Sequence, residues 1–340
     1  MLTDRQLLIL QVIVDDFIST AQPVGSRSIS KKDSVTFSSA TIRNEMADLE
    51  EMGFIEKTHS SSGRVPSEKG YRFYVDHLLS PLRLSGSEIT TIRGAFAEQM
   101  MEFERVVQKS ASILSDLTNY TSIVLGPEIF ETKLKQLQIV PLSEQSAIAI
   151  LVTDTGHVEH RAFNVPSEIS GADLEKMMNI LNSRLQGVPL VKLHEKLFTE
   201  IDELIRKHTS QHEEAFTYLR AALIDDHPSK LYIGGKTNIL MQPEFRDLDK
   251  VRSLYATMEK EAEMADLLRS DPEGIHVRIG QENPFDSMQN CSLITASYHL
   301  GNDQVGTIAL LGPTRMEYNR MFSLMNVLSK HMTRTFRDWY

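Results

Sequence analysis

The chain has 340 residues, with 36 Lys and Arg against 46 Asp and Glu, and a formal net charge of −10. This length predicts two or three domains, and a content of 41% hydrophobic and 24% charged residues excludes a disordered chain. The single cysteine, Cys291, excludes an intrachain disulfide and a cysteine-rich zinc site, and it indicates a reducing compartment. No apolar run approaches the ~20 residues of a membrane span, and the N-terminus lacks a signal-peptide pattern. We therefore expect a cytoplasmic protein that has no membrane partner.

Residues 1–78 form the first predicted domain, and their charges are segregated. This stretch carries 9 Lys and Arg against 11 Asp and Glu. Four bases and one acid lie between Ser26 and Arg43, and the same counts recur between Lys57 and Arg72. Acids collect between the two basic segments, from Glu45 to Glu56. This distribution is typical of a small nucleic-acid-binding module that has one working face.

Three helices are predicted in this domain from local start and stop signals. Thr3, followed three residues later by a glutamine, predicts a capping box that opens the first helix. A short second helix begins within Pro23–Ser26 and carries basic residues. Ser38 or Ser39 caps the third helix, which continues to Met52 and ends at a glycine.

The third helix has one apolar face and one face suited to DNA. Ile42, Met46 and Leu49 share the face expected to point toward the core. Arginine can bind guanine and asparagine can bind adenine through two hydrogen bonds each, and a helix N-terminus favours phosphate. The residues expected on the opposite face are Ala40, Thr41, Arg43, Asn44 and Ala47.

A predicted hairpin follows the third helix. Two short strands, within Phe54–Lys57 and Arg64–Pro66, flank a serine-rich tip, and a further helix begins near Ser67. This layout predicts a winged helix–turn–helix that binds double-stranded DNA, although three short basic helices also occur in other small domains. The candidate DNA contacts are Arg27, Lys31, Lys32, Ser38, Ser39, Thr41, Arg43, Asn44 and Arg64.

The rest of the chain is predicted to be α+β, interrupted by an insertion. Residues 79–118 form a linker and a long connecting helix, and strand-like runs lie in 119–187 and again in 247–340. Each set is too small for a good sheet, so we predict one sheet of six or seven strands that joins both. Residues 188–246, with two helical patterns and the short strand Lys230–Ile233, form the predicted inserted domain.

Other motifs carry little chemistry. Gly234-Gly235-Lys236-Thr237 lacks the upstream glycine of a phosphate-binding loop and is interpreted as a turn. His208 and His212 lie one helical turn apart, but their order is not that of a zinc protease, so we expect no metal. Cys291 is expected to be a buried apolar residue. No nucleophile, base and orienting group come together in the sequence, so we expect neither an enzyme nor a cofactor.

The chain resembles the heat-inducible transcription repressor family (HrcA). The resemblance is dense over residues 1–78 and looser, in length and element order, from residue 80 to 340. The strings that carry it are Pro23-Val24-Gly25-Ser26-Arg27, Ser39-Ala40-Thr41-Ile42-Arg43-Asn44-Glu45-Met46, Leu49-Glu50, Ser61-Ser62-Gly63-Arg64-Val65-Pro66 and Gly70-Tyr71-Arg72.

This resemblance implies a winged helix–turn–helix, a GAF-like α+β domain in two parts and an inserted dimerising domain. It also implies a homodimer that binds an inverted-repeat operator of chaperone operons, with activity that depends on a GroEL-type chaperonin. The alternative is a transcriptional regulator gated by a small molecule in the GAF-like domain.

Overall fold

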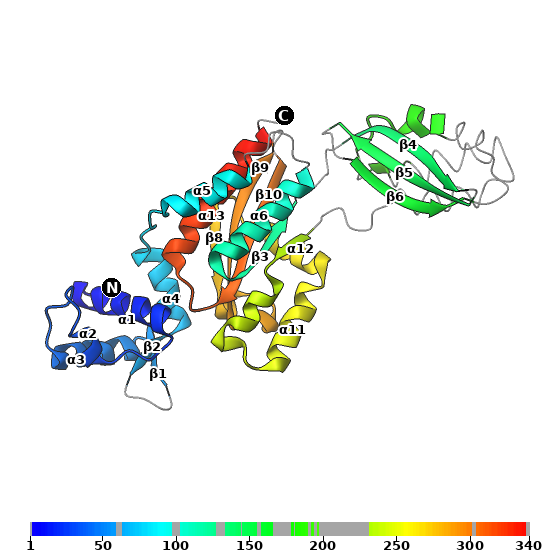
Figure 1. Cartoon of the computed structure of the whole chain (residues 1–340). Coiled ribbons are helices and arrows are strands. Elements are labelled where there is room, and N and C mark those ends of the chain that lie inside the picture. The colour runs from blue at the N-terminus through cyan, green and yellow to red at the C-terminus, as the bar shows by residue number, and fades with distance from the viewer. Residues whose placement is uncertain are drawn as a thin grey trace. The chain divides into compact units, whose positions relative to one another are not determined.

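The computed structural model of the chain (Figure 1) divides into two units, each with its own apolar core. The first unit contains Met1–Gly126, Leu231–Leu300 and Val305–Trp339, and most of the second is Pro127–Lys230. The residues that the structure describes are 2–58, 63–96, 103–126, 133–143, 145–154, 158–165, 178–179, 181–189, 192–193, 196, 231–300 and 304–337.

Residues 2–78 are called the N-terminal module below. Its first and third helices begin at the capping residues that the sequence predicts. The Thr3 hydroxyl accepts the backbone N–H of Gln6 at 3.3 Å, and the Gln6 side chain accepts the N–H of Thr3 at 3.0 Å. Ser38, rather than Ser39, caps the third helix. The elements are α1 (Asp4–Thr20), α2 (Ser26–Ile29), α3 (Ser39–Glu51), β1 (Ile55–Lys57), β2 (Arg64–Pro66), α4 (Glu68–Phe73) and the π-helical segment η1 (Tyr74–Leu78).

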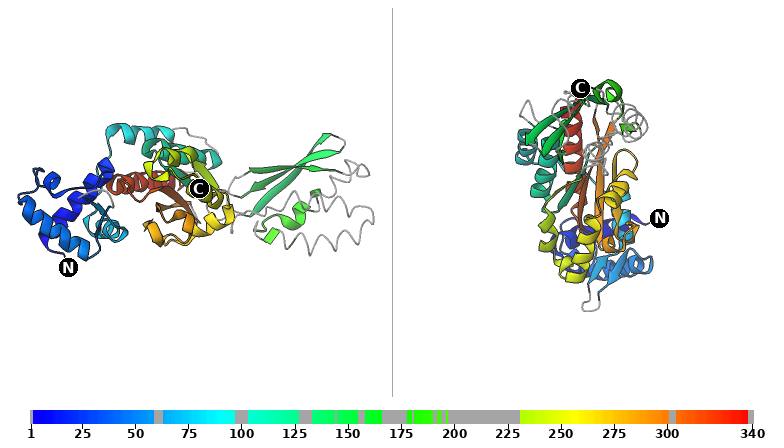
Figure 2. Two further views of the ribbon diagram at one scale, coloured as in Figure 1. Left: turned by 90° about the horizontal axis from the view of Figure 1, so that it is seen from below. Right: turned by 90° about the vertical axis from the view of Figure 1, so that its right-hand side faces the viewer.

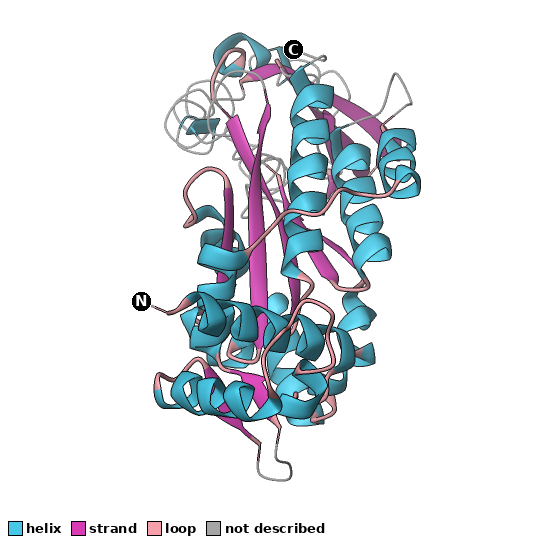
Figure 3. Cartoon of the chain, turned by 90° about the vertical axis from the view of Figure 1, so that its left-hand side faces the viewer, coloured by secondary structure: helices cyan, strands magenta, loops and turns pink. Residues whose placement is uncertain are grey.

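A five-stranded sheet, called the core sheet below, forms the centre of the first unit (Figure 3). Its strand order is β7-β3-β10-β9-β8, so strands from both ends of the unit's sequence interleave. The pairs β10–β3, β3–β7 and β8–β9 are antiparallel. The elements are α5 (Gly86–Ala95), α6 (Phe103–Thr118), β3 (Thr121–Leu125), β7 (Leu231–Gly234), α11 (Leu248–Met258), α12 (Glu261–Arg269), β8 (Ile275–Ile279), β9 (Cys291–Leu300), β10 (Gln304–Pro313) and α13 (Tyr318–Arg337).

Helices cover both faces of the core sheet, and side-chain alternation along the strands shows it. Ile308 and Leu310 of β10 pack in a cluster with residues of α6 and α13. Ala309 and Leu311, their neighbours, pack in a second cluster with residues of α11 and α12. Because successive residues of a strand point to opposite faces, the sheet is the middle of three layers.

The second unit contains an antiparallel sheet of order β4-β5-β6 (Figure 2). Buried and half-buried residues alternate along β5, as expected for a sheet with one face covered. The Asn182 side chain accepts the N–H of Leu137 and donates to its carbonyl, both at 2.8 Å, which joins a helical segment to β4. The strands are β4 (Leu134–Ser143), β5 (Ser146–Thr153) and β6 (Val158–Asn164).

The prediction of one sheet with six or seven strands is therefore wrong. Strands β4–β6 form their own sheet, and the strand placed in the insertion, β7, pairs with β3 of the core sheet. The separate unit spans 127–230, whereas the sequence placed the insertion at 188–246. Hydrophobic alternation identifies a strand but does not specify its neighbour, which is why the pattern assigned β4–β6 to the wrong sheet.

Two helical predictions also change. The apolar pattern over 248–268 predicts one long helix, but the structure breaks it between α11 and α12, where Lys260 leaves the helical conformation at φ −82° and ψ 79°. The long connecting helix is described as α5 and α6, and residues 97–102 lie outside the described part. The two helical patterns of the predicted insertion, 191–208 and 211–224, lie outside the described residues apart from 192–193 and 196. Gly187 follows a helical pattern that ends near Leu185 and is predicted to stop it, and it has φ +78°.

The Gly234-Gly235 pair is a close-packed turn, which agrees with its interpretation from the sequence. A Cβ on Gly234 would lie 2.5 Å from the carbonyl oxygen of Ala111 in α6. Gly235 has φ +60°, and a Cβ there would overlap the Ser115 hydroxyl. The pair is needed because β7 packs directly against the backbone of α6.

Gly234→Ala should therefore destabilise the first unit. The added methyl meets backbone, which cannot rotate away, so the overpacking should cost about 1–3 kcal/mol and lower the melting temperature by several degrees. Thermal unfolding followed by circular dichroism measures this. Gly94→Ala, in α5 where a Cβ meets nothing within 4 Å, is the control and should not lower the melting temperature. Equal melting temperatures for the two variants would contradict the packing argument.

Glu88 ties α5 to α13 and confers a pH dependence on stability. It accepts hydrogen bonds from the Ser85 hydroxyl and backbone N–H, both at 2.8 Å, and from Arg320 Nε at 3.0 Å. The Ser85 hydroxyl first, and then the Ser85 backbone and Arg320, lower the pKa of Glu88 below its ordinary value of 4.5. The folded state thus favours the carboxylate more than the unfolded state does.

This stabilisation should be complete above pH 4.5 and should be lost as the pH falls through the lowered folded-state pKa. Glu88→Gln should accordingly lower the melting temperature at neutral pH, and the deficit should shrink once the pH drops below that value. Melting curves of both proteins across pH measure the difference. Glu263→Gln, which breaks an exposed pair with Lys260 at the start of α12, controls for the lost charge. A pH-independent deficit for Glu88→Gln would rule out this linkage.

Candidate nucleic-acid interface

Helix α3 presents the two faces that its sequence predicts. Ile42, Met46 and Leu49 are buried in the core of the N-terminal module. Arg43 and Asn44 are exposed, as are Ala40 and Ala47, while Thr41 is half-buried. Among the described residues, no ion pair or hydrogen bond engages the Arg43 or Asn44 side chain. Both side chains are therefore available to a ligand.

The hydroxyl groups at the start of α3 form a local network. The Ser38 hydroxyl accepts the N–H of Thr41 at 3.1 Å and lies 2.9 Å from the Thr41 hydroxyl. The Ser39 hydroxyl lies 3.2 Å from that of Ser26, which links α3 to the start of α2. These contacts hold in place the N-terminal end of α3, which carries the predicted base-reading residues.

The basic residues near α2 differ in their environment. Arg27 and Lys31 are exposed, and among the described residues neither has an ion pair. Lys32 Nζ lies 2.5 Å from Asp16 Oδ1 of α1. The charge of Lys32 is thus partly neutralised within the module, whereas the charges of Arg27 and Lys31 are not.

The hairpin is joined to the turn before α2 through the backbone. β1 pairs with β2 in the register Ile55↔Pro66 to Lys57↔Arg64. Val24 extends this ladder, since its N–H donates to the Arg64 carbonyl at 2.8 Å and the Arg64 N–H donates back at 2.9 Å. Gly63 has no room for a side chain, because a Cβ would lie 2.8 Å from the carbonyl carbon of Pro23. Two strings that are about 35 residues apart in sequence therefore form one structural unit.

Arg64, the predicted DNA contact in the wing, forms an ion pair within the module. Its Nε and Nη2 each lie 2.7 Å from Glu50 Oε2 on α3, and its side chain is 18% exposed. The guanidinium thus fixes the hairpin relative to α3. Sequence reasoning missed the partner because Glu50 lies fourteen residues away, and only the shared occurrence of Leu49-Glu50 and Arg64 in the family-like strings hinted at it.

Helix α4 secures the end of α3, a role that sequence reasoning did not assign. The Ser67 hydroxyl donates to the Gly53 carbonyl at 2.6 Å and accepts the Gly70 N–H at 3.0 Å. Lys69 donates to the Met52 carbonyl at 2.7 Å and lies over the Phe54 ring. A Cβ on Gly70 would overlap the Phe54 carbonyl oxygen, so only glycine permits this approach.

The remaining candidates carry no visible site. Cys291 is fully buried, and burial raises the pKa of its thiol to about 12. His208 and His212 lie outside the described residues. Within the described part of the chain, no group of three or more His, Cys, Asp or Glu side chains is arranged to hold a metal ion. No helix of that part combines the length and apolarity that a membrane crossing requires.

Comparisons with known proteins agree on one family. Residues 104–322 match the model of the HrcA protein C-terminal domain. A heat-inducible transcription repressor HrcA from Oceanobacillus iheyensis is 57% identical over 340 residues, which cover 100% of this chain and 99% of that protein. A solved structure of a hypothetical protein superposes with a TM-score of 0.70 at 22% identity, covering 100% of both chains. That structure shows that the fold is shared.

Ser67→Ala should loosen the junction between α3 and the hairpin. The change leaves the Gly53 carbonyl and the Gly70 N–H without their partner, and Ser67 is buried, so we expect a loss of about 1–3 kcal/mol in unfolding free energy. Chemical denaturation of the full chain measures it. Ser30→Ala removes a surface hydroxyl that donates to Arg27, which water can replace, and should cost much less. Similar losses for the two variants would refute the assigned role of Ser67.

Proposed function

Because this chain belongs to the HrcA family of heat-inducible transcription repressors, we propose that its N-terminal module is a winged helix–turn–helix that binds operator DNA. The observation that carries the proposal is the exposed face of α3, where Arg43 and Asn44 have no partner in the described structure. The module buries the other face of α3 and fixes both its ends, so these two side chains project from a rigid support. Such a helix fits the major groove.

Each candidate residue then has a distinct role. Arg43 and Asn44 read base edges, and Ser38, Ser39 and Thr41 contact phosphates or bases at the N-terminus of α3. Arg27 and Lys31 contact the phosphate backbone. Lys32 contributes less, because Asp16 already neutralises part of its charge. Arg64 contacts DNA from the wing, and its ion pair with Glu50 holds the hairpin in position for that contact.

We also propose a homodimer, because an inverted-repeat operator has two-fold symmetry and a dimer matches it. The core sheet carries helices on both faces, an arrangement that is consistent with a GAF-like domain. The unit of 127–230 is then the inserted dimerising domain, with boundaries revised from 188–246. Access to the chromosome requires a cytoplasmic location.

The binding test is fluorescence anisotropy on a labelled inverted-repeat duplex and on a scrambled duplex of the same composition. Arg43→Ala should lose about 1–3 kcal/mol on the specific duplex and little on the scrambled one. Lys31→Ala should weaken binding to both duplexes equally and reduce the slope of log affinity against log salt by about 1. Lys32→Ala should have a smaller effect than Lys31→Ala.

Two results would contradict the proposal. Equal losses on the two duplexes for Arg43→Ala would remove its base-reading role. Weak and equal binding of the folded wild-type protein to both duplexes would show that α3 is not a recognition helix. Release of the operator when a small metabolite binds tightly to the protein would instead support the ligand-gated alternative.

Dependence on a GroEL-type chaperonin is the remaining part of the proposal. We expect added chaperonin to raise the fraction of protein that binds the operator, measured by titration of active sites with labelled duplex. The control is a chaperonin unable to release its substrate. Operator binding that is complete without chaperonin would instead place heat sensing in the unfolding of the repressor itself.

A further inference from the structure

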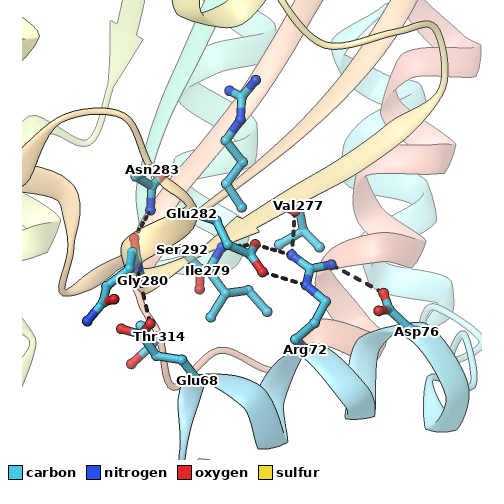
Figure 4. A network of polar contacts seen from close by, with 12 residues as sticks. Glu68, Arg72, Asp76, Val277, Ile279, Gly280, Glu282, Asn283, Ser292 and Thr314 are labelled. Carbon is cyan, nitrogen blue, oxygen red and sulfur yellow. Dashed lines mark hydrogen bonds and ion pairs between the residues drawn. The ribbon is translucent and has the colours of Figure 1, made fainter.

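Arg72 of α4 connects the N-terminal module to the core sheet (Figure 4). Its Nη2 donates to the Val277 carbonyl in β8 at 2.7 Å, and its Nε donates to Glu282 Oε1 at 2.8 Å. Nη2 also contacts the other oxygen of Glu282, so the carboxylate is gripped by two donors. Nη1 donates to Asp76, four residues further along in η1, at 3.2 Å. A planar guanidinium with this many acceptors has one orientation.

The segment that receives Arg72 is itself rigid. Residues 279–283, called the junction loop below, begin at the last residue of β8. Glu282 Oε2 accepts the N–H of Ile279 at 2.8 Å, which closes the loop on itself. The buried Asn283 side chain donates to the carbonyls of Gly280, Met288 and Cys291 at 2.9–3.2 Å. The loop therefore holds the carboxylate of Glu282 at a fixed position relative to the core sheet.

Glu68, one turn before Arg72 on α4, contacts the same loop. Its Oε2 accepts the N–H of Gln281 at 3.2 Å. Its carboxylate occupies the space where a side chain at residue 280 would lie, and Gly280 has φ +56°. An acidic and a basic side chain of α4 thus meet the junction loop side by side, as Figure 4 shows. Two such contacts prevent α4 from rotating about its axis.

A separate set of contacts holds α1 and η1 against the residues that follow β10, on the side of the core sheet. Arg315, which follows β10, donates from Nη1 to the Ile18 carbonyl at 2.9 Å, and Glu244 accepts its Nε at 2.7 Å. The Tyr74 hydroxyl donates to Asp15 at 2.6 Å and accepts the Asn319 amide of α13 at 2.8 Å. The N-terminal module is therefore attached at α4, at the end of α1 and at Tyr74 of η1. Contacts at several points define both its position and its angle.

We propose that Arg72 and Glu282 set the distance between operator half-sites that the repressor accepts. The inference rests on the proposed function. In a dimer, the two α3 helices must reach half-sites about 34–36 Å apart, or a multiple of that distance. A module held rigidly on its core presents α3 at one angle, so only one spacing satisfies both halves. A module that swivels accepts several spacings, each less tightly, because the effective concentration of the second half-site falls.

The polar contacts add direction to an apolar cluster that the N-terminal module shares with the core sheet. The Arg72 and Glu282 side chains are 29% and 40% exposed, so a single exposed pair adds little to stability. Directional hydrogen bonds nevertheless specify orientation strongly, because a small rotation breaks them. Loss of the pair should therefore change geometry more than it changes folding.

The test measures binding of full-length protein to a panel of duplexes. One set carries the inverted repeat with spacers of different length, including one changed by about 5 base pairs, or half a helical turn. Another duplex carries a single half-site. Glu282→Ala is the main variant, because Glu282 lies next to β8 of the core sheet and is no part of the proposed DNA-binding surface. Arg72→Ala and the double variant complete a cycle, and Lys260→Ala, which breaks an exposed ion pair at the start of α12, is the matched control.

The wild-type protein should bind one spacing best, with a steep fall when the spacer changes by half a turn. Glu282→Ala and Arg72→Ala should each reduce this ratio by about tenfold, with unchanged affinity for the single half-site. The double variant should be no worse than either single one, because the two residues act through one contact. Lys260→Ala should keep the wild-type profile.

Three outcomes separate the explanations. A wild-type spacing profile in folded Glu282→Ala would overturn the inference, as would a lower melting temperature with that profile unchanged, which is what a merely stabilising contact gives. Should Arg72→Ala fail to fold, Glu282→Ala alone decides the matter. If wild-type protein does not distinguish the operator from scrambled DNA, the proposed function fails and not only this inference.

Discussion

The proposed presentation of α3 depends on the contact of Arg72 with Glu282 and the Val277 carbonyl. It joins a helix that completes the N-terminal module to a strand of the core sheet. The same helix, through Ser67, Lys69 and Gly70, also secures the end of α3. One short helix therefore determines both how the exposed face of α3 is supported and how the module is held on the core.

Within the N-terminal module, backbone approaches explain why its motifs occur as separate strings. Gly63 packs on Pro23, and the Arg64 backbone pairs with Val24, so the string before α2 and the string at the hairpin are parts of one ladder. Gly70 of α4 packs on the carbonyl of Phe54, the residue before β1. These glycines have a steric role, since a methyl group at either position would separate the elements that it joins.

Much of the N-terminal module could be predicted because its signals are local. The capping box at Thr3, the serine cap of α3 and the spacing of Ile42, Met46 and Leu49 each act within a few residues, and the structure confirms them. The partner of Arg64 could not be predicted in this way. A charged side chain in a hairpin is compatible with DNA, with solvent or with a carboxylate elsewhere, and only the folded chain shows that Glu50 is its partner.

The sequence by itself determined the helices and hairpin strands of the N-terminal module and the exposed face of α3, because hydrophobic period and capping depend on neighbouring residues. Only the tertiary structure decided which strands share a sheet, where the inserted unit begins and what Arg72 binds. Strand pairing and ion pairing depend on distances between residues far apart in the chain, as with β3 and β7 or Arg72 and Glu282. Those distances exist only once the whole chain has packed.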